Sequence, residues 1–282
     1  MSSEIFQSLI RLLDDPDEDV YASVKDKLLE YGTSALTHLE SAWENNNHQL
    51  TQTRAEEIIH QIHLNDHLNK LNQWIKTPQK NLVDAWIILT QHRFPNFDGT
   101  LYSEQLSLLA DEAKQSIELT DSDFEKVAAF NHFLFNEKGF KGNTNNYHSP
   151  NNSCLNYVMD NRKGNPLSLS IIYLHLSKQI GLPVCGVNMP RHFIVGFEND
   201  MFGDPIKFYI NPFSKGTILS RQDLEHFLQK EKIKEETKYF SPCGHVEIVK
   251  RMINNLLYSY TFKGDQEKTN ELIKFLQLFK SY

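Results

Sequence analysis

The sequence has few cysteines, no long hydrophobic run and no excess of positive charge. Its 282 residues include three cysteines, Cys154, Cys185 and Cys243, which are odd in number and widely spaced. Domains that depend on disulfides carry paired cysteines at short spacing, so that class is excluded and a reducing compartment is favoured. We therefore expect a cytoplasmic protein.

Membrane and nucleic-acid proteins are also disfavoured. No apolar stretch approaches the ~18 residues that a membrane-spanning helix requires. The opening segment MSSEIFQSLIRLLDD has acidic residues where a secretion signal has a basic region followed by a continuous apolar one. The formal net charge of -7 gives no general attraction to nucleic acid or to an anionic membrane surface. We expect none of these associations.

The remaining composition is typical of a globular protein with more than one structural unit. Hydrophobic residues make up 40% of the chain and charged residues 23%. A chain of this length buries a sizeable core and is more often built from two or three units than from one. The spacing of apolar residues and of Pro and Gly indicates where these units lie.

Residues 1–93 show helical periodicity. The segment LIRLLDDPDEDVYASVKDKLLEYGTSALTHL has an acidic turn with a proline before a valine, and a glycine that ends the second helix. This pattern resembles a HEAT-type helical hairpin. Because such hairpins cannot bury their apolar faces alone, they must pack on each other or on the next part of the chain.

After a break at Arg93–Gly99 the pattern becomes mixed. Helical periodicity predicts four helices: residues 102–116, residues 121–137, residues 155–161 and a long apolar helix that begins at residue 166. The period then changes to two, which predicts three strands: residues 183–189, 192–198 and 206–213. A helix followed by an antiparallel meander indicates an α+β domain. Residues 241–282 predict a helical hairpin, TPR-like, that is broken at Gly264.

Several motifs occur in order: GF-x-GN, Y-x-x-P-x-NS, RKG-x-P-x-SLS, P-x-HF and x-PF-x-x-G. They lie within FNHFLFNEKGFKGNTNNYHSPNNSCLNYVMDNRKGNPLSLSIIYLHLSKQIGLPVCGVNMPRHFIVG and YINPFSKGTILSRQDL. In them the sequence resembles the SirB-type, transglutaminase-like family of bacterial proteins, a related domain of which occurs in a vertebrate F-box protein. The resemblance covers about residues 94–255. It implies a transglutaminase-like, papain-related α+β fold flanked by helical repeats, without an established activity.

The expected fold class is therefore α+β, in three parts. Residues 1–93 are expected to form a HEAT-like all-α region. Residues 94–240 are expected to form the transglutaminase-like domain with a small antiparallel sheet. Residues 241–282 are expected to form the C-terminal helical hairpin.

Enzymes with this fold use a Cys at the first turn of the helix, a His on the facing strand and an Asp or Asn on the next strand. The resemblance places His192 and Asn211 at the second and third positions. The nucleophile position holds Pro166, which suits the first helical position but has no nucleophilic atom. The family commonly has Asp at 211, and Asn removes the charge that would stabilise an imidazolium. We interpret His192 and Asn211 as remnants of a triad in a pseudoenzyme.

Two residues are candidates for a substitute nucleophile. Ser168 lies in the first helical turn, which has free N–H groups, and is expected near His192. Cys154 precedes a short helix, whose N-terminus would lower the pKa of its thiol. Each also has a structural interpretation, Ser168 as a cap and Cys154 as a small buried side chain. Cys185 and Cys243 are expected to be structural.

A further set of residues is expected to contact a ligand in the cleft. Arg162 and Lys163 precede the helix N-terminus, where cations and free N–H groups bind carboxylate or phosphate. Arg191, beside His192, carries the same charge. Each residue of the set also has an interpretation as loop packing or solvated surface. The set is Tyr147, His148, Arg162, Lys163, Asn165, Pro166 and Arg191.

His60, His63 and His67 lie on one face of a helix, at i, i+3 and i+7. The outer pair is separated by about 10 Å along the axis, too far for one metal ion. We expect a solvated face here, and we expect neither a metal nor a cofactor in the protein.

These observations leave three functional hypotheses. The first is a non-enzymatic module that binds a peptide, a small ligand or a protein partner. The second is a hydrolase or acyl-transferase that uses Ser168 or Cys154 with His192. The third is a structural adaptor that works through the helical repeats. Pro166 favours the first hypothesis.

Overall fold

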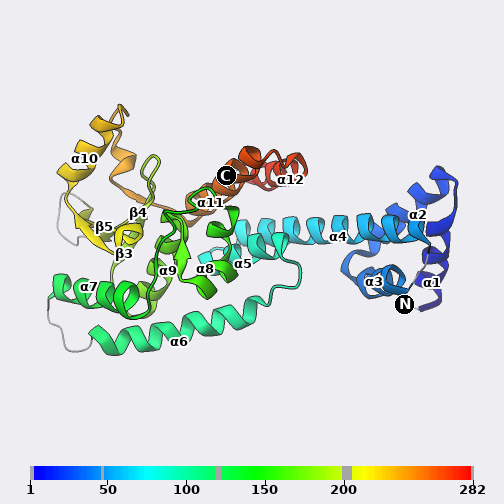
Figure 1. Cartoon of the computed structure of the whole chain (residues 1–282), viewed down its shortest axis with the longest axis horizontal. Coiled ribbons are helices and arrows are strands. Elements are labelled where there is room, and N and C mark those ends of the chain that lie inside the picture. The colour runs from blue at the N-terminus through cyan, green and yellow to red at the C-terminus, as the bar shows by residue number, and fades with distance from the viewer. Residues whose placement is uncertain (1–2, 46–47, 118–121, 199–204, 281–282) are drawn as a thin grey trace. The chain divides into compact units, whose positions relative to one another are not determined.

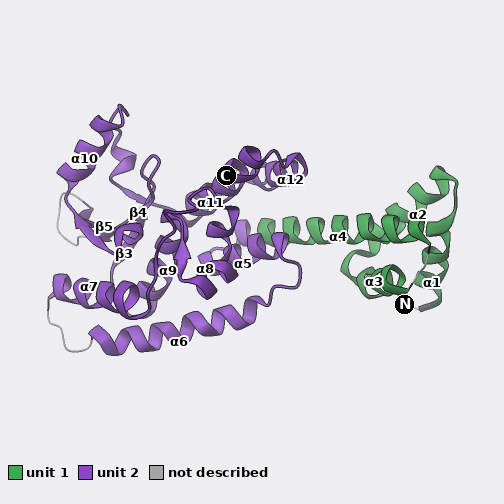
Figure 2. Ribbon diagram, viewed as in Figure 1, with its two compact units in different colours: residues 1–73 green, residues 74–282 purple. Residues whose placement is uncertain are grey.

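The computed structural model describes residues 3–45, 48–117, 122–198 and 205–280. The chain divides into two compact units, residues 1–73 and residues 74–282, which Figure 2 colours separately. The order of the helices and strands along the chain can be followed in Figure 1. None of the described helices is long and apolar enough to cross a lipid bilayer.

Unit 1 is helical. Its elements are α1 (Ser3–Arg11), η1 (Leu12–Asp14), α2 (Glu18–Tyr31), η2 (Gly32–Ala35), α3 (Leu36–Asn45) and most of α4 (Gln49–Lys76). Buried Arg54 of α4 holds the acidic turn, since its guanidinium donates to the carbonyls of Leu13 and Asp15 and pairs with Glu18. The apolar faces meet in one core cluster: Phe6, Leu13, Val24, Leu28, Ala35, Leu39, Ala55, Ile58 and Ile62.

Unit 2 combines helices with a small sheet. Its longer helices are α5 (Leu82–Arg93), α6 (Gly99–Ile117), α7 (Asp123–Asn131), α8 (Leu155–Asn161), α9 (Pro166–Gln179), α10 (Arg221–Lys230), α11 (His245–Lys263) and α12 (Gln266–Gln277). Its short helical turns are η3 (His132–Glu137), η4 (Pro150–Ser153), η5 (Pro212–Ser214) and η6 (Thr237–Tyr239). The expected helix over residues 121–137 lies partly outside the described residues, and its C-terminal part is the π-helix η3.

The main sheet is antiparallel, with the order β6-β5-β4-β3-β7. Its strands are β3 (Val184–Val187), β4 (Ile194–Glu198), β5 (Ile206–Asn211), β6 (Thr217–Leu219) and β7 (Pro242–Cys243). The two short strands β1 (Lys141–Gly142) and β2 (Lys163–Gly164) pair in parallel beside the start of α9. The central strand β4 is buried from Ile194 to Phe197. Helix α9 contacts this strand. Ile194 also belongs to a core cluster with Leu224 and Leu228 of α10.

Helix α9 is the centre of the core of unit 2. It is apolar on nearly all sides, which is typical of a helix surrounded by protein. It contacts the strands β3 and β4 and the helices α5, α6, α8 and α11. Because every side is packed, the position of its N-terminus is fixed by the whole unit.

The predicted fold class is confirmed: helices at the N-terminus, a central domain with a small antiparallel sheet, and helices at the C-terminus. Helix α5 was expected with the N-terminal region but is part of unit 2. Its side chains explain this, since Trp86 Nε1 donates to the carbonyl of Ser153 at 2.7 Å and Thr90 Oγ1 accepts from the backbone N–H of Leu155 at 3.1 Å. The HEAT-like and TPR-like character and the domain limits at residues 93 and 240 remain predictions.

Candidate functional site

The first turn of α9 is held by a closed set of hydrogen bonds. Asn165 caps the helix, because its Oδ1 accepts from the backbone N–H of Ser168 at 2.8 Å. The Ser168 hydroxyl accepts in return from the backbone N–H of Asn165 at 2.9 Å. Asn165 Nδ2 also donates to the Ser153 hydroxyl. A Cβ at Gly164 would lie 2.4 Å from Ser168 Oγ, so this network leaves room only for glycine there.

Pro166 is the first residue of α9 and is buried. At this position the missing N–H costs nothing, since the first N–H groups of a helix have no partner within it. Apart from its backbone, Pro166 therefore presents only CH2 groups at the start of the helix.

His192 and Asn211 meet at the ends of neighbouring strands. His192 lies just before β4 and Asn211 ends β5, and Asn211 Nδ2 lies 3.2 Å from His192 Nε2. The orientation of the amide follows from Ser214, whose backbone N–H donates to Asn211 Oδ1 at 3.3 Å. Asn211 therefore presents its NH2 group to the ring, and His192 Nε2 accepts. The imidazole then carries its proton on Nδ1.

The surroundings of His192 favour its neutral form. The ring is half-buried beside the aromatic rings of Phe213 and Phe227, at centroid distances of 6.0 and 6.3 Å. Burial lowers the pKa of His192 below its ordinary value, and this effect exceeds the raising contribution of the contact with Asn211, while the Arg251 cation lowers the pKa further.

A cavity of about 500 Å³ opens at the N-terminus of α9. Four segments line it: residues 147–149, residues 165–167, Arg191 with Phe193, and one face of α11. Two cations lie in this lining, Arg191 and Arg251, and it contains no Asp or Glu among the described residues. The volume is in the range of small-molecule and peptide-side-chain sites.

The cavity brings together five of the residues expected to contact a ligand: Tyr147, His148, Asn165, Pro166 and Arg191. Arg191 adopts a left-handed backbone conformation with φ 61° and pairs with Glu231. Arg162 and Lys163 do not line the cavity. The Arg162 guanidinium lies over the Phe140 ring at 4.7 Å, and Lys163 pairs with Lys141 in the short parallel strands.

The face of α11 was not predicted from the sequence. Arg251, Asn255, Tyr258 and Ser259 recur at i, i+4, i+7 and i+8, so they lie on one side of the helix. Arg251 Nη1 donates to Asn188 Oδ1 at 3.0 Å and approaches the carbonyl of Met189 at 3.4 Å. The helical spacing of these four polar and aromatic residues was the available signal, but nothing in the sequence indicates that they meet Pro166.

The two candidate nucleophiles lie outside the cavity lining. Ser168 is buried, with its hydroxyl engaged in the cap of α9. Cys154 is also buried, and its thiol lies 3.4 Å from the carbonyl of Pro150. Burial raises the pKa of Cys154 to about 11, opposite to the lowering expected at a helix N-terminus. Desolvation of the thiolate therefore outweighs the lowering of its pKa by the Arg93 cation.

Cys185 of β3 and Cys243 of β7 are half-buried in the sheet. Burial raises the pKa of each thiol to about 12, so both are protonated at neutral pH. Neither lines the cavity at α9.

The histidine face of α4 is less exposed than expected. His67 is buried, and its ring stacks on that of His63 at a centroid distance of 6.1 Å. Burial lowers the pKa of His63, which favours its neutral form. The expectation of a fully solvated face is therefore wrong for His67.

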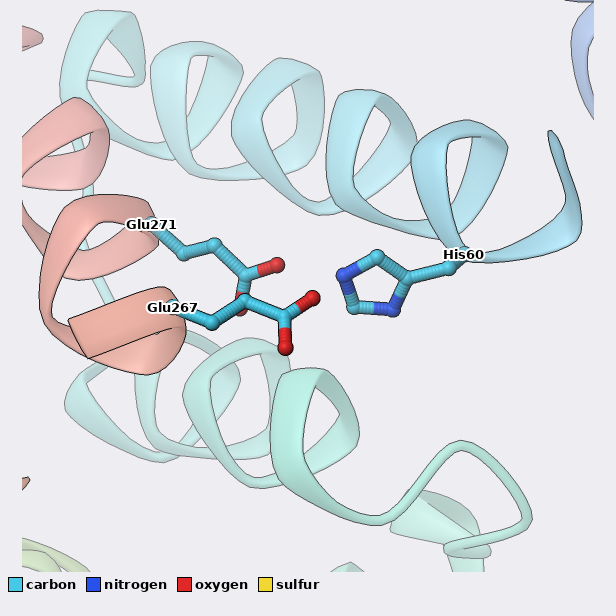
Figure 3. A group of neighbouring side chains, drawn as sticks. All are labelled: His60, Glu267 and Glu271. Carbon is cyan, nitrogen blue, oxygen red and sulfur yellow. The ribbon is translucent and has the colours of Figure 1, made fainter. Parts of the chain in front are cut away.

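A pair of carboxylates lies on α12. Glu267 and Glu271 are one turn apart, and Figure 3 shows both side chains extending from the same side of the helix. The buried carboxylate of Glu271 lies 3.0 Å from Lys268 Nζ and 3.3 Å from His92 Nε2, both within unit 2. We interpret Glu271 as part of the packing of α12 on α5. His60, also drawn in Figure 3, belongs to unit 1.

Comparison with known proteins identifies relatives among the UPF0162 proteins and an F-box protein. The chain is 28% identical over 193 residues to a UPF0162 protein of Xylella fastidiosa, covering 66% of this chain and 67% of that protein. It is 26% identical over 178 residues to the UPF0162 protein YchA of Escherichia coli, covering 62% and 63%. Human F-box only protein 21 is 23% identical over 231 residues, which are 72% of this chain but 36% of the human protein.

No solved structure matches the chain significantly. The model of the transglutaminase-like superfamily matches residues 100–254. That range holds α6 to α10, the whole sheet, the Pro166 turn, His192 and Asn211. It is more than half of the chain. The chain therefore belongs to the transglutaminase-like superfamily.

Proposed function

We propose that this protein is a catalytically degenerate, SirB-type member of the superfamily that binds a peptide or a small ligand in the cavity at the start of α9. The observation that carries the proposal is Pro166 at the first position of that helix, lining the cavity where the enzymes have a thiol. The cavity around Pro166 is lined by polar and cationic groups. A site that kept its shape without its nucleophile is suited to binding.

The state of His192 supports the same proposal. A general base needs an unprotonated nitrogen that faces the nucleophile. With Nε2 accepting from Asn211, the other ring nitrogen carries the proton and acts as a donor. His192 and Asn211 are not among the described residues that line the cavity, so this pair supports the proposal only because the ring lacks the free base nitrogen of a catalytic histidine. Asn211 also lacks the negative charge that would stabilise an imidazolium.

Labelling with two activity probes tests the absence of catalysis. Wild-type protein and the His192→Ala variant are treated at neutral pH with a fluorescent iodoacetamide and a fluorescent fluorophosphonate. We expect slow labelling in both proteins, because Cys154 is buried with a raised pKa and Ser168 is engaged in a cap. The urea-unfolded protein is the positive control for the thiols. Rapid labelling of Cys154 or Ser168 that His192→Ala abolishes would instead support the hydrolase or acyl-transferase hypothesis.

A second function, as a structural adaptor, is favoured by the surface of unit 1. Several large apolar side chains of this unit are two-fifths or more exposed: Ile5 41%, Leu12 41%, Trp43 44% and Leu50 42%. Such residues are candidates for contact with a protein partner. In a pull-down from cell extract, an adaptor loses its partner with Trp43→Ser and retains it with Arg251→Gln. A cleft-binding module gives the reverse result.

A further inference from the structure

We infer that the cavity at α9 takes a peptide segment in which a carboxylate stands next to an aromatic or large apolar side chain. The carboxylate lies against Arg251, and the apolar side chain lies on a row of aromatic rings at the cavity mouth. This inference rests on the proposed function and adds the chemical class of the ligand.

The charge of the cavity favours one carboxylate. The chain as a whole has a formal net charge of -7, yet the described lining of the cavity holds two arginines and no acidic residue. Arg191 is already paired with Glu231. Arg251 is half-buried, and among the described residues no carboxylate pairs with it. One cation without a counter-charge in a cavity fits a ligand with one negative charge.

The geometry of Arg251 suits a planar acceptor. Its hydrogen bonds to Asn188 and Met189 both leave from Nη1. A guanidinium has five N–H donors in a fixed fork, so Nη2 and Nε remain for a bidentate carboxylate. The N-terminus of α9 adds to the positive potential, since Leu167 lines the cavity in the first turn of that helix.

The aromatic row defines the second half of the ligand. Phe213, Tyr147 and His148 follow one another at centroid distances of 5.8 and 5.2 Å, and His148 lies 5.8 Å from Tyr258 and 5.6 Å from Phe262. Tyr258 is 60% exposed and Phe262 is 71% exposed. Binding hot spots are enriched in tyrosine and arginine, and this cavity combines exposed tyrosines with an arginine.

The length of the row favours a peptide over a small molecule. Tyr147, His148 and Tyr258 line the cavity, whereas Phe213 and Phe262 lie one ring beyond it. A ligand that uses the whole row must therefore extend outside the cavity. The charge of the lining favours a carboxylate over a phosphate. A phosphate group carries up to two negative charges, whereas Arg251 is the one cation of the lining without a described acidic partner.

Fluorescence polarisation with short labelled peptides tests the inference. Four probes share a Gly-Ser background. One has an internal Phe-Glu pair and an amidated C-terminus, the second has Phe-Gln, the third has Phe-phosphoserine, and the fourth has Phe at a free C-terminal carboxylate. We expect binding of the Phe-Glu peptide or of the peptide with the free C-terminal carboxylate. Whichever of these two peptides binds more tightly shows whether the cavity takes a Glu side chain or a chain terminus. Binding of Phe-Gln is expected to be about ten-fold weaker or more.

Variants locate the site. Arg251→Gln and Arg251→Lys are each expected to weaken binding by about ten-fold, since Lys keeps the charge but loses the fork. Tyr258→Ala, at an exposed position, is expected to weaken it without affecting folding. Lys178→Gln removes the same charge from an exposed site at the other end of α9 and is expected to bind as wild type.

Several results would overturn the inference. They are no binding of either carboxylate peptide, equal binding of Phe-Gln, tighter binding of phosphoserine, or unchanged binding in the Arg251 and Tyr258 variants. These results can be told apart from a failure of the proposed function. The proposed function fails if the activity probes label Cys154 or Ser168 and His192→Ala abolishes that labelling.

Discussion

The two sides of the first turn of α9 differ in how their polar groups are satisfied. On the capping side, Asn165, Ser168 and Ser153 form a closed hydrogen-bonded set that is buried in the domain. On the cavity side, Pro166 offers no polar atom, and Arg251 faces the space without a described acidic partner. The capping side therefore serves the fold, whereas the cavity side retains groups that the fold does not use.

Between the two sides of this turn, the larger effect on stability is expected on the capping side. Asn165→Ala removes the N-cap of α9 and leaves the buried Ser153 hydroxyl without its donor. We expect the free energy of unfolding to fall by about 2 kcal/mol. Urea denaturation measures it, with Asn145→Ala, an exposed loop position, as the matched control. A loss no larger than that of the control would show that the hydrogen-bonded set does not stabilise the turn.

A smaller, pH-dependent effect is expected from His192. Its pKa is lowered by burial in the folded state, so below its ordinary pKa of about 6.5 the unfolded chain binds more protons than the folded one. The stability from neutral His192 is present above that pH and is lost as the pH falls toward the folded-state pKa. Urea denaturation between neutral and mildly acidic pH should therefore show a shallower decline for His192→Gln than for wild type. Equal slopes would contradict the assignment of a neutral imidazole.

The smallest effect on stability is expected at the aromatic row. Tyr258→Ala and Phe262→Ala change exposed side chains, so each should alter the free energy of unfolding by no more than about 0.5 kcal/mol. Thermal or urea unfolding checks this. Phe275→Ala on α12, a fully buried position, is the contrasting control and is expected to cost about 3 kcal/mol or more. Large losses at 258 or 262 would mean that these rings serve folding instead of binding.

Local signals in the sequence predicted much of the fold. The helix expected over residues 155–161 is α8, and the helix expected to begin at Pro166 is α9. Gly264, expected to break the C-terminal hairpin, ends α11 with φ 75°. The change of period from 3.6 to 2 located β4, which begins just after His192, and β5, which ends at Asn211. Each of these features depends on residues that are near in the chain.

The features that the sequence left undecided depend on burial and on particular side-chain contacts. Arg251 joins Pro166 in one cavity, although α11 begins far along the chain from α9. The pKa of Cys154 is raised because the thiol is buried, and burial cannot be read from a helix N-terminus alone. Asn211 donates to His192 because the backbone of Ser214 fixes its amide, a detail of the turn after β5. Sequence periodicity contains no information on such contacts.

The most direct test of the proposed binding cleft introduces a thiol at position 166, the first residue of α9. In Pro166→Cys, alkylation by iodoacetamide at neutral pH is mapped by mass spectrometry, with and without the Phe-Glu peptide. We predict that the introduced thiol is labelled faster than the three native cysteines, that the peptide protects it, and that wild type shows no fast site. Fast, His192-dependent labelling of Cys154 in wild type, or an introduced thiol that the peptide leaves unprotected, would contradict a non-catalytic binding cleft.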